Sequence, residues 1–199
     1  MEIRSPRRTF VVLCEGERTE PEYFSALRRD RLIREVSAVD LRIETESAGA
    51  VPLTLVRAAI AAKRKAVAEE KEIDEFWCVF DVECPRNHPF LKQALNLARE
   101  HDIFVAVSNP CFEVWLALHF HGFTAWLDND AARRLRREYD GQLGKGLDGA
   151  RYMPRRRAAA QRAADLDRRH VLNGTEFPHD NPSSGMHRLL AAIEPPIDS

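Results

Sequence analysis

The chain has 199 residues, of which 44% are hydrophobic and 31% charged, and its formal net charge is −1. This length suits one domain with an appendage, and no apolar run approaches the ~18 residues that would indicate a membrane span. The four cysteines form no CxxC pair, so we expect reduced thiols rather than a zinc or disulfide framework.

The first eight residues are charged and lead directly into an apolar strand pattern, which is not the pattern of a signal peptide. Together with the expected reduced thiols, this predicts a cytoplasmic protein that does not associate with membranes.

Strand and helix patterns alternate over the first 120 residues. Apolar or alternating runs predict strands at 10–14, 39–44, 76–80 and 103–107, and periodic segments predict helices at 19–36, 51–71, 90–101 and 111–121. This alternation is typical of an α/β fold, with a mostly parallel sheet and helices on both faces. Thr19 and Glu22 have the T-x-x-E spacing of a capping box, which predicts the start of the first helix.

No strand pattern follows Gly122. Helical patterns continue at 128–139, with Asp128 as N-cap, at 154–171 and at 184–193. We therefore divide the chain into an α/β core, 1–122, and a helical C-terminal part, 123–199, packed on the core.

Acidic residues follow two of the predicted strands. Glu15 comes directly after the first strand, and Asp81 and Glu83 form a D-x-E pair after the third. Residues two apart in an extended chain point the same way, so Asp81 and Glu83 are expected to share one cation. Carboxylates suit Mg²⁺ or Mn²⁺, which would act on a phosphoryl group or on water. The alternative is that these acids only cap loops.

Two further acids have open assignments. Glu20 is either a ligand of a second metal ion or an acid that the helix dipole favours in a first turn. Glu113 lies one turn into the helix after the fourth strand, where it either completes the metal site or sits on the exposed side.

Basic residues are concentrated in the C-terminal part. Residues 123–175 have a formal charge of +5, whereas 1–122 and 176–199 each have −3. This predicts contacts with a phosphate backbone, and a solvated arginine-rich face is the alternative. Few aromatic residues are interleaved with the arginines, so base stacking is not predicted. The candidate nucleic-acid contacts are Arg133, Arg137, Arg155, Arg156 and Lys145.

Lys145 lies in a glycine-flanked loop, 141–146, that does not have the spacing of a phosphate-binding loop. No strand precedes this loop, which is a further reason to reject a phosphate-binding loop. We expect Lys145 to reach a phosphate instead as a mobile cation.

Four blocks of the sequence resemble the RloB family, a Toprim-like group found in prokaryotic defence loci. They are CEGERTEPEYF at 14–24, WCVFD at 77–81, SNPCFEVWL at 108–116 and NPSS at 181–184. The resemblance implies a Toprim-type core in which Glu15 acts as general acid/base and Asp81 binds Mg²⁺. It also implies association with an ABC-type ATPase. The chain departs from the family's D-R-D pattern, because Val82 and Glu83 follow Asp81.

The leading hypothesis is a metal-dependent nuclease that cleaves RNA, such as tRNA, or DNA as an effector of antiviral defence. Glu15, Asp81 and Glu83 would be its catalytic residues, with Glu20 and Glu113 as further metal ligands. One alternative is a non-catalytic nucleic-acid-binding or regulatory subunit of an ATPase complex, and another is a nucleotide-binding sensor.

Overall fold

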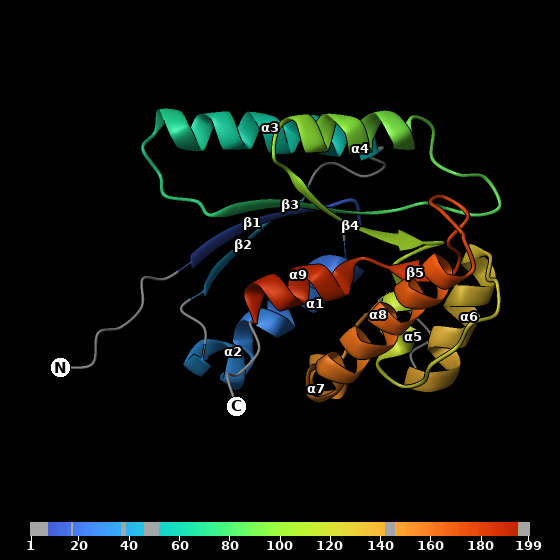
Figure 1. The fold of residues 1–199 in the computed structure, drawn as a ribbon. Coiled ribbons are helices and arrows are strands. Elements are labelled where there is room, and N and C mark those ends of the chain that lie inside the picture. Colours follow the sequence, from blue (N-terminus) through green and yellow to red (C-terminus); the bar gives the residue numbers. More distant parts are fainter. Residues whose placement is uncertain (1–7, 17, 37–38, 46–51, 142–145, 195–199) are drawn as a thin grey trace.

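Within the residues that the structure describes, five strands form one sheet in the order β2-β1-β3-β4-β5, and helices pack on both of its faces (Figure 1). The computed structural model describes residues 8–16, 18–36, 39–45, 52–141 and 146–194. The strands are β1 (Arg8–Cys14), β2 (Val39–Thr45), β3 (Glu75–Asp81), β4 (Phe104–Asn109) and β5 (Ser183–Ser184). The helices are α1 (Thr19–Arg29), α2 (Arg31–Val36), α3 (Pro52–Ala68), α4 (Leu91–Glu100), α5 (Glu113–Leu118), α6 (Asn129–Asp140), α7 (Gly149–Tyr152), the 3₁₀-helix η1 (Met153–Arg155), α8 (Arg156–Leu172) and α9 (Met186–Ile193).

The strands β1 to β4 are parallel, and β1 and β3 are buried on both of their faces. Phe10 and Val12 of β1 point into the core shared with α1, α5, α8 and α9. Val11 and Leu13 point into a second core under α3 and α4. Burial on both faces explains why the strands read as nearly continuous apolar runs. The prediction of an α/β fold with helices on both faces and a helical C-terminal extension is confirmed.

Several elements differ from the sequence-based expectation. The helix predicted at 19–36 is two helices, because Asp30 leaves helical geometry with φ −58° and ψ 134°. The C-terminal part also contributes a strand, β5, which pairs antiparallel with β4 through Ser183 and Ser184. Two serines in a row have neither the apolar run nor the alternation that marks a strand, so no sequence pattern predicted it.

The C-terminal part packs closely on the core. A side chain at Gly185 would place its Cβ 3.1 Å from the backbone nitrogen of Val107, so glycine lets this segment approach β4. The predicted N-cap of α6 is confirmed, since the Asp128 side chain accepts a hydrogen bond of 2.7 Å from the N–H of Ala131.

Within the described ranges, no helix has the length and apolar character needed to cross a membrane. Residues 1–7, which carry the expectation about a signal peptide, lie outside those ranges.

Candidate functional site

Glu15 connects the carboxyl ends of β1 and β3. Its Oε2 accepts a hydrogen bond of 3.0 Å from the backbone N–H of Asp81, and its own N–H donates to the carbonyl of Val79. On its other side, Oε1 lies 2.5 Å from Nε2 of His88, in the loop between β3 and α4. The structure therefore brings Glu15 and Asp81 together, as predicted for acids that follow neighbouring parallel strands.

His88 is a site residue that the sequence did not reveal. The close contact with the Glu15 carboxylate raises the pKa of His88, and this effect outweighs the opposing effect of partial burial. A single histidine in a loop, without a second histidine at a ligand spacing, gives no sequence signal. Only the folding of the 82–90 loop back over β1 places it against Glu15.

Asp81 lies at the centre of the acidic residues. Its Oδ1 is buried and has no hydrogen-bond partner among the described residues. Burial raises the pKa of Asp81 well above its usual range, and the charges of four other carboxylates raise it further. These carboxylates are Glu20, Glu15, Glu113 and Glu83. The four other acids proposed from the sequence thus lie close enough to Asp81 to act on its carboxylate.

Glu20 is buried over the turn that follows β1. A Cβ atom at Gly16 would overlap the Glu20 carboxylate, so a larger residue there would require this carboxylate to move. Burial raises the pKa of Glu20 to about 7, with Glu113 and Glu15 adding to the effect, although backbone hydrogen bonds oppose it. A buried acid among acids is not explained by the helix dipole, which favours acids at exposed first turns. The structure therefore places Glu20 among the other acids, and its role as a metal ligand stays a prediction.

The titration of Glu20 predicts how stability depends on pH in the absence of metal. Its pKa is higher in the folded than in the unfolded chain, so the folded state binds more protons between the two values. The free energy of unfolding should therefore fall by on the order of 3 kcal/mol as the pH rises from about 5 to about 8. Urea denaturation in chelator across this range measures the slope.

A Glu20→Gln variant is the control for this slope. It should make the pH dependence shallower by the contribution of Glu20, while the decline caused by the raised pKa values of Asp81 and His88 remains. An unchanged slope in the variant would assign the dependence to other groups.

Glu83 departs from the predicted geometry. Its backbone is left-handed, with φ 68°, and the side-chain amide of Asn129 donates a hydrogen bond to its Oε2. The extended chain that the prediction assumed is therefore not present at Glu83, and the sharing of one cation by Asp81 and Glu83 stays a prediction. In the part of the chain that the structure describes, no three histidine, cysteine, aspartate or glutamate side chains are close enough to hold a metal ion. The site brings carboxylates together, but the described side chains do not form a complete set of metal ligands.

The predicted basic contacts separate into different groups. Arg133, on α6, lies beside the acids, since the charges of Glu113 and Glu83 raise its pKa against the opposing effect of burial. Arg137 is exposed one turn further along α6. Arg155 is also exposed, with its guanidinium 5.4 Å from the centre of the Phe120 ring. Lys145 lies outside the described residues.

Arg156 is not a surface contact, which corrects the prediction. Its side chain is only 4% exposed and is bound to Glu194 through two hydrogen bonds of 2.8 and 3.0 Å. Asp30 lies 3.2 Å away on its other side. The sequence could not distinguish this arginine from its exposed neighbours because all belong to one run, 155–157.

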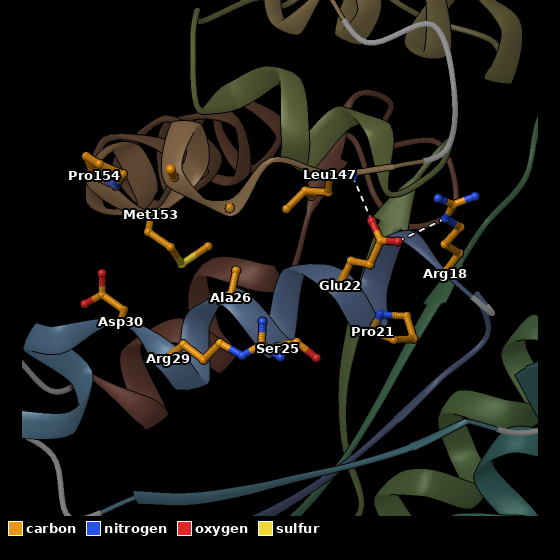
Figure 2. Close-up of a pocket in the computed structure, with 12 residues that line it drawn as sticks. Arg18, Pro21, Glu22, Ser25, Ala26, Arg29, Asp30, Leu147, Met153 and Pro154 are labelled. Carbon is orange, nitrogen blue, oxygen red and sulfur yellow. Dashed lines mark hydrogen bonds and ion pairs between the residues drawn. The ribbon is translucent and has the colours of Figure 1, made fainter.

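A groove of about 730 Å³ runs between α1 and the α7–η1 segment (Figure 2). Glu22 points across it, accepting hydrogen bonds of 2.7 Å from the N–H of Leu147 and 3.0 Å from Nε of Arg18. The expected capping box is therefore not formed, since Arg18 is the N-cap and Glu22 binds elsewhere. None of the five acids described above lines this groove.

Comparison with known proteins identifies the family. The chain matches the family model described as RloB-like protein over residues 10–193. No curated protein and no solved structure matched it. Because the match runs from β1 to the end of α9, it includes the carboxylates, the β3–α4 loop and the C-terminal helices. The chain belongs to the RloB-like protein family.

Proposed function

We propose that this protein is a metal-dependent nuclease that hydrolyses phosphodiester bonds in RNA, such as tRNA, or in DNA. The observation that carries the proposal is the buried, unpartnered Oδ1 of Asp81 among four other carboxylates. A divalent cation would give Oδ1 of Asp81 a binding partner, and it would reduce the mutual repulsion of the carboxylates. The resemblance to Toprim-like proteins, which place such acids at the same strand ends, supports this assignment.

The residues fit Mg²⁺ or Mn²⁺ by the chemistry of their oxygen donors. Asp81 with Glu20 or Glu113 would hold the ion together with water and substrate oxygens, which does not require the set of three side-chain ligands that the described residues lack. Glu83 would join them after leaving Asn129. When bound, the ion supplies electrophilic activation of a phosphoryl oxygen and a water of lowered pKa.

The chain's own residues supply orientation and proton handling. Glu15 is held by the N–H of Asp81 and by His88, so its carboxylate is fixed where a proton of the attacking or leaving oxygen would be transferred. Arg133 presents a guanidinium beside the acids, and its planar fork suits a phosphate.

We further propose that the protein acts in the cytoplasm, in antiviral defence, with an ABC-type ATPase as partner.

Cleavage assays test the nuclease proposal directly. Purified protein with total tRNA, other RNA or plasmid DNA should cleave at least one of them in Mg²⁺ or Mn²⁺ and none in chelator. Glu15→Gln should reduce cleavage at least about 100-fold, because it keeps the shape but removes the proton acceptor. Glu22→Gln, at the groove on α1, should cleave within about twofold of the unmodified protein.

A second candidate is a non-catalytic nucleic-acid-binding or regulatory subunit of an ATPase complex. The observation that favours it is that Glu83 is held by Asn129 and that the described side chains form no finished metal cage. Nucleic-acid binding that weakens steeply as the salt concentration rises, without cleavage in Mg²⁺ or Mn²⁺, would support this candidate over the nuclease.

A further inference from the structure

Two large aromatic side chains are exposed on the segments that surround the carboxylates. Trp126, between α5 and α6, is 62% exposed, and Phe90, at the end of the β3–α4 loop, is 63% exposed. Large aromatic residues normally contribute to stability by being buried, so their exposure beside a candidate site points to a binding role. Base stacking was not predicted from the sequence, because these residues lie outside the arginine-rich helices.

Trp126 is held close to the acids by its backbone. It precedes Asn129, which binds Glu83, by three residues, and three residues span at most roughly 11 Å. The neighbouring Leu127 exchanges two hydrogen bonds with the Asn181 side chain, of 3.1 and 2.7 Å. In Figure 1 this region and the α8–β5 loop lie beyond the carboxyl ends of β3 and β4. The backbone is therefore fixed while the indole ring faces solvent.

Phe90 occupies an unfavourable backbone conformation on the other side of the site. It follows His88, the partner of Glu15, by two residues. Its φ of 62° and ψ of 20° are left-handed, a conformation that bulky residues rarely adopt and that glycine or asparagine would satisfy better. Neither burial nor backbone preference explains a phenylalanine here, and such outliers cluster at ligand sites.

Positive charge accompanies each aromatic residue. Arg86 is exposed on the same loop as Phe90, and Arg133 lies on the helix that begins three residues after Trp126. Exposed aromatics combined with arginines are what proteins use to hold single strands, with bases stacked on the rings and phosphates bound by the guanidinium groups. Bases within a duplex have their faces covered by neighbouring bases, so two projecting rings favour unpaired bases.

We propose that Trp126 and Phe90 stack unpaired bases of a nucleic-acid strand on either side of the carboxylates. This inference rests on the proposed function in so far as the site acts on nucleic acid, and it specifies the substrate as single strands or loops.

Tryptophan fluorescence measured in chelator tests binding separately from cleavage. Trp77 and Trp115 are 4% and 0% exposed, so Trp126 dominates any change in emission on binding from solvent. An oligothymidylate strand should quench the emission. Trp126→Leu removes the fluorescent reporter, so the affinities of the variants are compared by the fluorescence anisotropy of dye-labelled oligothymidylate. Trp126→Leu and Phe90→Leu should each weaken this affinity about tenfold, which is the scale of losing one stacked base. The matching strand with abasic sites should bind both variants and the unmodified protein equally.

Phe104→Leu is the matched control, because Phe104 is 47% exposed at the opposite end of the sheet, and its affinity should be unchanged. The proposal is overturned if both loop variants bind oligothymidylate as the unmodified protein does, or if their loss persists with the abasic strand. It is also overturned if the two loop variants change the sedimentation coefficient of the protein without changing its affinity for the strand. The rings would then form an interface between copies of the protein. Stacking without cleavage in any metal would reject the nuclease and leave this inference standing.

Discussion

Replacing Asp81 by asparagine is expected to abolish metal-dependent cleavage, lowering the rate at least about 1000-fold. Asparagine keeps the shape of the side chain but removes the charge that would anchor a cation at the centre of the acids. In chelator the same variant should unfold at a higher temperature than the unmodified protein, because it removes a buried charge that four carboxylates repel. Calorimetric titration with Mn²⁺ and thermal unfolding with and without metal measure both effects.

Asp102→Asn is the matched control for this prediction. The Asp102 side chain is 89% exposed at the turn before β4, and its left-handed backbone, with φ 51°, suits asparagine. This control should keep its cleavage rate and melting temperature. If Asp81→Asn also retained Mn²⁺ binding and cleavage, Asp81 would not be a metal ligand and its raised pKa would be only a result of burial.

The fold could be predicted where one physical signal dominated. β1 and β3 are buried on both faces, so their apolar runs indicate strands whatever packs against them. Asp128 was recognisable as an N-cap because that interaction is made with the next residues along the chain. β5 was missed because Ser183 and Ser184 become a strand only by pairing with β4, and that contact is not encoded in their own pattern.

The site was predictable in composition and not in geometry. Parallel strands carry the residues after them to one edge, which is why Glu15 and Asp81 meet. The same reasoning does not hold for Glu83, because its own left-handed backbone turns the side chain toward Asn129, a residue 46 positions away in the sequence. His88 and Trp126 were not found for a related reason, because their positions depend on loops anchored by distant parts of the chain.

Arg156 shows how burial reverses the role expected of a charged residue. Its guanidinium binds both oxygens of Glu194 and the carbonyl of Met153, and Asp30 lies within ion-pair distance. Burial raises the pKa of Glu194, but the hydrogen bonds from Arg156 and Arg157 outweigh it, so the carboxyl titrates below its usual range. These contacts join η1 and α8 to the ends of α1 and α9, so the arginine connects the C-terminal part to the core.

Arg156→Met is therefore expected to lower the free energy of unfolding by about 3–5 kcal/mol, because it leaves a buried carboxylate without its main partner. Arg157→Met should lower it by less than about 1 kcal/mol, since Arg157 is 54% exposed although it contacts the same carboxylate. Urea denaturation at neutral pH compares the two. If Arg156→Met does not fold, Glu194→Gln, which keeps the shape and removes the charge, should still be clearly less stable than Arg157→Met. Equal stabilities of the three variants would mean that Arg156 is solvated, and its predicted contact with nucleic acid would have to be reinstated.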